Sequence, residues 1–344
     1  MVAPGCDSGA GGGDRSTAAS HPSPTLWRVD GDGALTPTQA RALTGLLGWG
    51  APRPTFDAGL ALALRDEMET ALAGVADALG HQQLGVTKRA LSQVHACERH
   101  AMSEEAVPFG WSPVTAVGAV AHKAIELSAT MRTPPPPEEL VDVALDRLAA
   151  DQDRGPGAWL LTADPVEVAE LRGAALDRVL KFADEFPPIK RSWRPRLESS
   201  LSASLCADRI WLRGRVDLAL GRPVGTTANV LIVDFKTGRP GRACADDLRF
   251  YALLETLRAG VPPFRVASWY LDSGQYHAED VTEDLLRSAA RRTVDGARAL
   301  YELRMGGRRA ELAPGPACGY CRERAACTGA ATWADQRRAL GLDA

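Results

Sequence analysis

Lysine is scarce in this chain, although basic residues as a whole are not. Only five lysines occur among the 40 lysine and arginine residues, and they are Lys88, Lys123, Lys181, Lys190 and Lys236. The ammonium group of lysine is compact and shifts its pKa readily, whereas the guanidinium of arginine is planar and always charged. A lysine that stands in a polar motif of such a chain therefore indicates a position where arginine would not serve.

The chain also lacks the segments that mark membrane and secreted proteins. No apolar run approaches the ~20 residues that span a bilayer. Residues 1–24 are rich in Gly, Ser and Ala and contain no apolar signal core. We therefore expect a disordered tail over residues 1–30, no membrane association and a cytoplasmic location. Seven cysteines, an odd number, favour thiols or metal ligands over a disulfide framework.

Positive charge is not in excess overall, since the formal net charge is −3. The chain therefore has no general basic footprint for nucleic acid. The segment between residues 287 and 338, however, contains eleven arginines and only five acidic residues. Such a segment either follows a nucleic-acid backbone or forms the solvated face of a helix, and both interpretations stay open. No Walker A pattern is present, so ATP-driven unwinding would need another chain.

Hydrophobic periodicity divides the chain into a helical first half and a mixed second half. Helical spacing occurs over residues 37–47, 56–79, 87–104, 112–131, 138–152, 165–186, 245–259 and 282–304. Strands are predicted over residues 197–205, 210–218, 230–233, 265–271 and 275–281, the first two joined by a turn at Ala207-Asp208. This order predicts an α/β fold of the mixed α+β kind, with a central mixed sheet flanked by helices.

The pattern with the clearest chemistry lies on two neighbouring predicted strands. Gly214-Arg215-Val216-Asp217 ends one strand, and Asp234-Phe235-Lys236 ends the next. Asp234 and Lys236 share a strand face, and we expect both near Asp217. Two carboxylates on one surface repel each other unless a cation or proton lies between them, and oxygen ligands suit Mg²⁺ or Mn²⁺. The pattern indicates metal-assisted phosphodiester hydrolysis; the alternative is that these charges merely end a strand in solvent.

Four further segments, two before the strand motif and two after it, match a known family in the expected order. They are residues 87–100 with Leu91 and Cys97, residues 118–126 with His122, Asp247-Leu248-Arg249-Phe250-Tyr251, and Cys318-Gly319-Tyr320-Cys321 followed by Cys327. Together with the strand motif they resemble the RecB-type nucleases of the PD-(D/E)XK superfamily, which include the AddB nuclease domain and CRISPR-associated RecB-like exonucleases. The resemblance covers about residues 87–330. It implies a restriction-endonuclease-like core, which we place at residues 86–330, between a helical N-terminal extension (31–85) and a C-terminal helix or tail (331–344).

The resemblance also implies a role for each residue of the motif. Asp217 and Asp234 would bridge the metal, while the carbonyl of Phe235 and a ring nitrogen of His122 would complete its ligands. An imidazole ligand favours Mn²⁺ over Mg²⁺. Lys236 would position or help deprotonate the attacking water, and the products would carry 5′-phosphates. From the residues alone, a single histidine among apolar helix neighbours is more often a packed core residue.

Three residues near this motif leave questions open. Tyr251 is expected to be a functional member of its helix. Glu198 falls where the family often has a carboxylate, and it is either close to the metal ligands or an exposed strand residue. Asp247 stands where the family has glutamine; an ionised aspartate only accepts hydrogen bonds and adds negative charge near a DNA phosphate. This departure puts substrate contact in doubt more than metal binding.

The closing cysteines form a dense set. Cys318, Cys321 and Cys327 lie within ten residues, and in the resembled family such a set, with Cys97 far upstream, holds a [4Fe–4S] cluster that ties the ends of the nuclease domain together. Four thiolates are the usual requirement for this cluster. Zinc is the competing interpretation, with His95 or His100 as a substitute ligand, and free thiols without metal are the third. We favour the iron–sulfur cluster because the wide split matches the family.

These expectations define a function. We expect a Mg²⁺- or Mn²⁺-dependent DNA nuclease, an exonuclease that acts on single strands or DNA ends in repair or recombination, with a separate helicase subunit as a candidate partner. One alternative is a catalytically silent DNA-binding or scaffold subunit of a helicase–nuclease complex. The complete set of Asp217, Asp234 and Lys236 argues against silence. Another alternative is a CRISPR-type adaptation nuclease, which gene neighbourhood would have to support.

Overall fold

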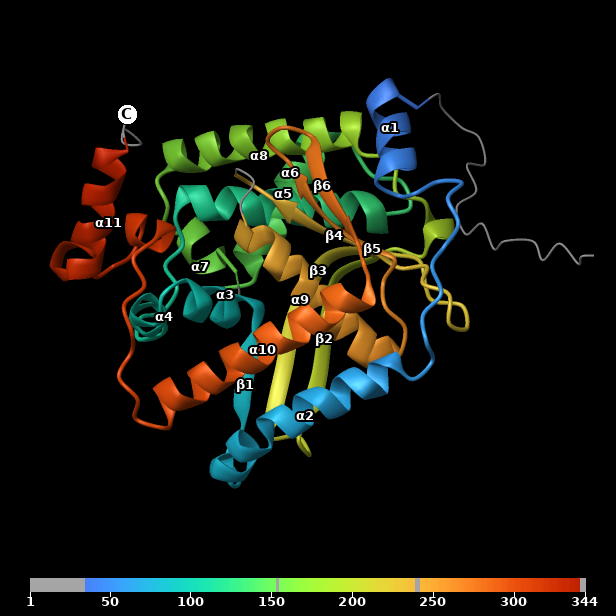
Figure 1. The fold of residues 1–344 in the computed structure, drawn as a ribbon. Coiled ribbons are helices and arrows are strands. Elements are labelled where there is room, and N and C mark those ends of the chain that lie inside the picture. The colour runs from blue at the N-terminus through green and yellow to red at the C-terminus, as the bar shows by residue number, and fades with distance from the viewer. Residues whose placement is uncertain (1–34, 153–154, 239–241, 341–344) are drawn as a thin grey trace, which may run out of the picture.

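The computed structural model of the chain describes residues 35–152, 155–238 and 242–340 (Figure 1). The tail expected over residues 1–30 lies outside these residues. The helices are α1 (Pro37–Gly45), α2 (Leu60–Leu79), α3 (Lys88–Ala96), α4 (Glu98–Glu105), α5 (Pro113–Thr130), α6 (Pro137–Ala150), α7 (Gly157–Leu160), α8 (Pro165–Glu185), α9 (Arg242–Ala259), α10 (Glu283–Arg304) and α11 (Thr328–Ala339). The strands are β1 (Leu84–Thr87), β2 (Arg196–Leu205), β3 (Ile210–Leu220), β4 (Leu231–Lys236), β5 (Arg265–Tyr270) and β6 (Gln275–Asp280).

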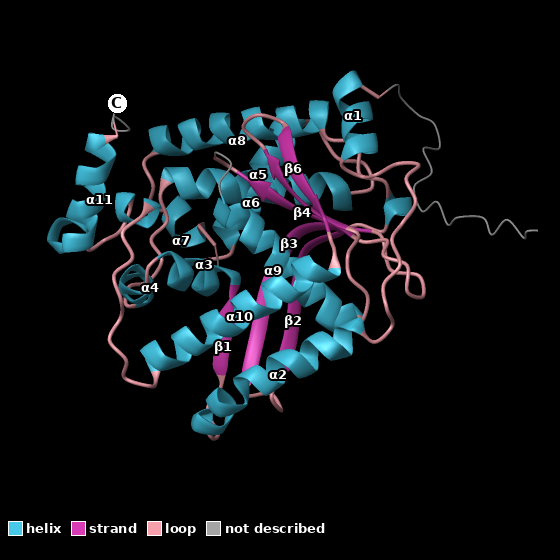
Figure 2. Cartoon of the chain, in the orientation of Figure 1, coloured by secondary structure: helices cyan, strands magenta, loops and turns pink. Residues whose placement is uncertain are grey.

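One mixed sheet lies between two layers of helices (Figure 2). Helices α1, α5, α6 and α8 pack on one face, over a core that includes Val233, Phe235 and Trp269. Helices α2, α3, α9 and α10 pack on the other face, over a core that includes Val216 and Ile232. This arrangement confirms the predicted α/β class with a central mixed sheet flanked by helices.

Strand β3 organises the sheet because its two edges are used differently. Strand β2 pairs antiparallel along one edge, from Ile210 to Ala219. The opposite edge is divided between two strands: β1 pairs in parallel with residues 210–213, and β4 pairs antiparallel with residues 218–220. Residues 214–217 therefore have no strand partner on this edge within the described chain. Strand β5 continues the sheet in parallel with β4, and β6 closes it antiparallel to β5.

Side-chain caps fix the starts of the helices that reach this divided edge. Ser112 and Thr115 form a capping box at the start of α5, with Pro113 in its first turn. The hydroxyl of Thr87 accepts a hydrogen bond from the Ala90 N–H at the start of α3. Because Thr87 is also the last residue of β1, the chain passes from strand to helix with no intervening loop.

Several sequence predictions need correction at this level. The helix expected over residues 87–104 is interrupted at Cys97, whose backbone is extended, and forms α3 and α4 instead. Strand β1 was not predicted, because four residues that include Gly85 are too short for a clear alternation. Helix α2 begins at Leu60 rather than at residue 56. The predicted turn at Ala207-Asp208 is confirmed, and both residues have positive φ.

The N-terminal helices belong to the two cores rather than to a layer of their own. Helix α1 contributes Leu43 to the core on the α5 side, and α2 contributes Leu64 and Met68 to the core on the α9 side. The boundary expected between an extension and a nuclease domain near residue 86 stays a prediction. No helix among the described residues combines the length and apolar character that crossing a bilayer requires.

Candidate active site and metal centre

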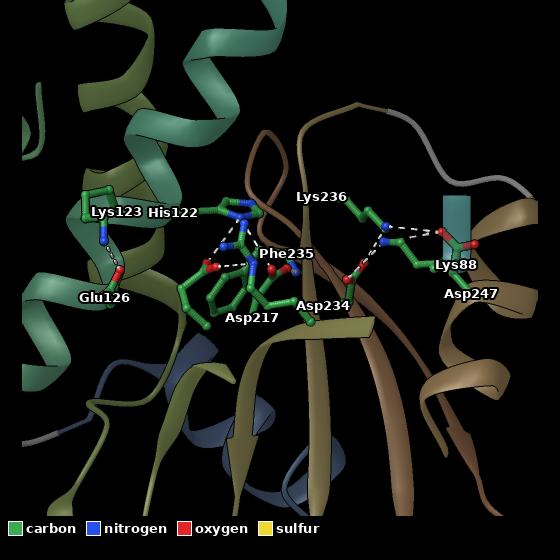
Figure 3. A network of polar contacts seen from close by, with 11 residues as sticks. Lys88, His122, Lys123, Glu126, Asp217, Asp234, Phe235, Lys236 and Asp247 are labelled. Atoms are coloured by element: carbon green, nitrogen blue, oxygen red, sulfur yellow. Dashed lines mark hydrogen bonds and ion pairs between the residues drawn. The ribbon is translucent and has the colours of Figure 1, made fainter. Parts of the chain in front are cut away.

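Asp217 lies in the gap on the divided edge of β3, where this strand separates from β4. The last paired residues of the two strands are Leu218 and Val233, and Asp217 and Asp234 follow immediately beyond them. There the Asp217 carboxylate accepts a hydrogen bond of 2.6 Å from the Phe235 N–H (Figure 3). A side chain thus takes the place of a strand partner, and it brings the two motif strands together.

The pairing of β2 with β3 is locally distorted at Glu198, opposite Asp217. Glu198 lies opposite Asp217, but the β2–β3 pairing skips this position, and Glu198 has a positive φ of 46°. Val216 packs into the core under α9, whereas Leu218 packs into the core under α5, so the side-chain alternation of β3 reverses at Asp217. A left-handed backbone at a non-glycine residue costs about 1–3 kcal/mol, and such residues cluster at functional sites.

His122 on α5 completes a group of three possible metal ligands. Its Nδ1 atom lies 3.5 Å from Oδ1 of Asp217 and 4.0 Å from Oε1 of Glu198. The His122 ring packs edge-on against the Phe235 ring at a centroid distance of 5.7 Å. One ligand atom from each of His122, Glu198 and Asp217 falls within 4.8 Å of the others. Two carboxylates and an imidazole suit Mn²⁺ or Mg²⁺, so these residues fit a divalent cation.

The electrostatics of this group favour a bound cation. Burial disfavours charge on His122, but Asp217 and Glu198 raise the pKa of its imidazole. Burial and then the neighbouring Asp217 raise the pKa of Glu198, while Arg215, 3.0 Å away, works against this. Burial acts to raise the pKa of Asp217, but His122 outweighs it, and the pKa of Asp217 is lowered. Positive charge favours ionised Asp217 but does not fully compensate Glu198, and a divalent ion would supply further positive charge to both.

A second group of charges surrounds Asp234, on the α9 side of the strand ends. The Asp234 carboxylate is 3% exposed and forms an ion pair with Lys236, while the Lys88 ammonium lies 3.7 Å from its other oxygen. Asp247 lies 3.6 Å from Lys88 and 3.8 Å from Lys236, both measured from its Oδ2 atom. Burial opposes charge on both lysines, but Asp234 and Asp247 raise their pKa values. Both ammonium groups are therefore charged at neutral pH.

The structure brings the predicted strand motif and the histidine helix to one place. His122 meets Asp217, and Asp234 and Lys236 project together from the end of β4 (Figure 3). Asp234 contacts the lysines rather than His122, and Glu198 occupies the third place in the group that fits a metal. Tyr251 is buried against the same strand gap, and burial raises the pKa of its hydroxyl. The individual roles expected for these residues stay predictions.

Lys88 is the site residue that the sequence motifs missed. It is the first residue of α3, and its ammonium lies 5.2 Å from the centre of the Tyr251 ring. The one sequence feature that could have drawn attention to Lys88 is the scarcity of lysine. Two of only five lysines, Lys88 and Lys236, meet at this site. The sequence could not show that the short strand before α3 pairs with β3 and delivers Lys88 there.

The four predicted cluster cysteines lie on segments that the fold joins. The Cys97 sulfur is 3.9 Å from the carbonyl oxygen of Glu311, at the start of the loop that carries Cys318, Cys321 and Cys327. Cys97 and Cys318 are buried, the other two are half-buried, and all four thiols are free. In the described chain, no three cysteine sulfurs lie within 4.8 Å of one another.

Polar and aromatic contacts tie α4 to this C-terminal loop. Arg308 forms a two-pronged ion pair with Glu98, with N–O distances of 2.6 and 2.9 Å. Further along, Arg322 contacts Glu104 at 3.1 Å. The His100 ring is 5.4 Å from that of Tyr320. The two ends of the expected nuclease domain are therefore in direct contact beside Cys97.

The arginine-rich segment between residues 287 and 338 is largely neutralised within the fold. Ion pairs engage at least seven of its eleven arginines, with carboxylates of the same or other helices; these arginines are Arg287, Arg292, Arg298, Arg304, Arg308, Arg322 and Arg338. Most of the local excess of charge therefore serves intramolecular contacts. The interpretation as a track for a nucleic-acid backbone gains no support from this arrangement.

Comparison with known proteins identifies the class to which this site belongs. The sequence profile of the PD-(D/E)XK nuclease superfamily matches residues 87–328, and the chain belongs to this superfamily. Its members are nucleases that use divalent metals, and the fold implies DNA as substrate. The group of His122, Glu198 and Asp217 provides a donor set of the required kind.

Two solved structures overlap most of the chain at low identity. A protein designated SSO0001 is 13% identical, with 78% of this chain and 94% of that chain covered, at a TM-score of 0.33. A protein from Eubacterium rectale described as a "Putative exonuclease" is 12% identical, with 72% and 90% covered, at a TM-score of 0.41. No curated protein matches the sequence.

Proposed function

We propose that this chain is a Mg²⁺- or Mn²⁺-dependent DNA exonuclease that acts on single strands or DNA ends. The observation that carries the proposal is that two groups of polar side chains lie on either side of the Phe235 peptide, whose N–H donates a hydrogen bond to Asp217. His122, Glu198 and Asp217 form a donor set for a divalent ion. Asp234 and Lys236 lie directly beside it and supply a carboxylate and a charged ammonium.

The residues of the site divide the work of phosphodiester hydrolysis. His122, Glu198 and Asp217 would hold a divalent ion, which would supply a more acidic water and stabilise charge on phosphate oxygens. Lys236 is 20% exposed and keeps its proton, since Asp234 raises its pKa against the effect of burial. Lys236 therefore donates hydrogen bonds to a phosphate oxygen or to the attacking water, and it acts as a cation in the resting site rather than as a base.

We also propose that Cys97, Cys318, Cys321 and Cys327 bind a [4Fe–4S] cluster that links the two ends of the domain. Tetrahedral zinc with Zn–S bonds of about 2.3 Å needs sulfur atoms about 3.8 Å apart. A cluster binds each thiolate through a separate iron and so holds the sulfurs further apart. What supports a shared centre is that the Cys97 sulfur lies 3.9 Å from the Glu311 carbonyl oxygen, at the start of the loop that carries the other three free thiols. Repair or recombination, with a separate helicase subunit, follows from the resemblance to RecB-type nucleases.

The test is degradation of end-labelled single-stranded DNA by protein purified without air. Wild type should cleave with Mn²⁺ or Mg²⁺, and Lys236→Ala should lose at least about a hundredfold in rate. Lys181→Ala is the matched control, because this lysine lies on α8 and its ammonium contacts only the Asp272 carbonyl among the contacts described. Undiminished cleavage by Lys236→Ala would remove Lys236 from the mechanism. No cleavage by cluster-loaded wild type would favour a DNA-binding or scaffold subunit instead.

A further inference from the structure

Asp247 is a carboxylate that the proposed chemistry does not use, yet it is largely buried between two lysines. Its side chain is 15% exposed, and one oxygen lies within 3.8 Å of both Lys88 and Lys236. Asp234 contacts the same two ammonium groups from the other side. The four side chains therefore form a closed ring of alternating charge, seen on the right of Figure 3.

The ring solves an electrostatic problem at the end of β4. Two ammonium groups that share only one carboxylate carry a net positive charge and repel each other. A divalent ion beside Asp217 also attracts Asp234, because the two carboxylates follow the same last pair of the β3–β4 ladder. If Asp234 turned toward that ion, Lys236 would lose its main partner. Asp247 is the one further carboxylate among the described contacts of Lys236 that can keep it in place.

We propose that Asp247 and Lys88 are positioning residues for Lys236. Asp247 would hold the Lys236 ammonium at the strand end if Asp234 turned toward a divalent ion, and Lys88 is the counter-ion that orients Asp247. This inference rests on the proposed nuclease function for its purpose, but its geometry does not depend on catalysis. It also explains Asp247 itself, because a neutral glutamine would leave Lys88 without a second carboxylate.

The fold delivers both residues from rigid elements. Lys88 begins α3 directly after β1, whose pairing with β3 fixes its position. Asp247 lies on α9, one turn before Tyr251, and the Lys88 ammonium also lies over that ring. The ring of charges therefore links α3 and α9 to the end of β4, at the open edge of β3.

The scarcity of lysine makes a spectroscopic test practical. Protein labelled with ¹³C at the lysine ε-carbon gives signals from only five lysines, which single Lys→Arg variants assign. In metal-free protein, Asp247→Asn should shift the signals of Lys88 and Lys236 and leave the other three unchanged. Glu126→Gln is the matched control, since Glu126 pairs with Lys123 on α5 and should shift only that signal. An unchanged Lys236 signal in Asp247→Asn would overturn the proposal.

A double-mutant cycle on DNA cleavage tests the functional consequence. Asp247→Asn and Lys88→Met should each lower kcat about tenfold and leave KM within about twofold, because both act through Lys236. The kcat of the double variant should be no lower than that of Asp247→Asn alone. Without Asp247, Lys88 no longer helps to position Lys236 and only competes with it for Asp234. Lys123→Met is the control and should leave kcat and KM unchanged, because Lys123 is about as exposed as Lys88, 30% against 27%, and pairs with Glu126. Additive losses, or losses confined to KM, would show independent substrate contacts and overturn the proposal. If wild type does not cleave DNA, the proposed nuclease function is wrong. The NMR experiment would still decide whether Asp247 positions Lys236.

Discussion

Replacing Gly214 by alanine tests the packing that holds α9 against the open edge of β3. A Cβ atom on Gly214 would lie 2.7 Å from Cε1 of Tyr251 and 3.1 Å from Cδ1 of Leu254. Tyr251 is 2% exposed and Leu254 is fully buried, so neither side chain can move into solvent. Overpacking of this kind costs about 1–3 kcal/mol. The φ angle of Gly214 is not in the left-handed region, so alanine also gains about 0.4–1 kcal/mol from a less flexible unfolded chain.

The net expectation is a loss of about 1–2 kcal/mol in the free energy of unfolding, measured by urea denaturation. Gly173→Ala on α8 is the control: nothing lies within 4 Å of its Cβ position, and it should stabilise the protein by about 0.5–1 kcal/mol. In a Tyr251→Leu background the cost of Gly214→Ala should shrink, because the nearest ring atom is gone. An unchanged or higher stability of Gly214→Ala, with the control behaving as expected, would refute the packing argument.

Three further predictions concern the metal, the acid response and the cluster. Without DNA, saturating Mn²⁺ should raise the melting temperature of wild type but not of Asp217→Asn, and an equal shift in both would exclude Asp217 as a ligand. Hydrogen bonds from Arg308 lower the pKa of Glu98, so the pair stabilises the fold above the unfolded pKa of Glu98 and ceases to do so as pH falls through the lower, folded value. The melting-temperature deficit of Glu98→Gln should therefore disappear in acid, and a deficit that is constant with pH would contradict this. Anaerobically purified Cys97→Ser should lose its bound iron and the visible absorption of the cluster, whereas full iron content would show that Cys97 is not a ligand.

Much of the site could be predicted because its parts lie on long, regular elements. The strand period places Asp234 and Lys236 on one face, and the antiparallel pairing of the consecutive strands β3 and β4 brings Asp217 beside them. His122 lies on a helix whose apolar spacing is clear, and the structure places its ring 3.5 Å from Asp217. These contacts depend on local pattern and on neighbouring elements, which a single sequence contains.

The rest of the site depends on contacts that no local pattern encodes. Lys88 reaches Asp234 only because β1, four residues long, pairs in parallel with the distant β3. Glu198 has a positive φ and lies 4.0 Å from His122, and nothing about a glutamate predicts a positive φ at this position. The partners of Asp247 are set by the packing of α9 against α3. The scarcity of lysine drew attention to Lys236, but it did not predict that Lys88 lies beside it.

The site lies where it does because one edge of β3 is left open. An open strand edge presents unpaired backbone groups, which normally require a partner. Here side chains of α9 and of β3 itself occupy the gap: Tyr251 packs on Gly214, and the Asp217 carboxylate accepts the N–H of Phe235. The peptide of Phe235 thus lies between two groups: the two carboxylates and the imidazole under α5, and the ring of two carboxylates and two ammonium groups under α9. A phosphodiester bound at these strand ends would meet the proposed metal ligands on one side and the two lysines on the other, and in-line hydrolysis uses both kinds of group.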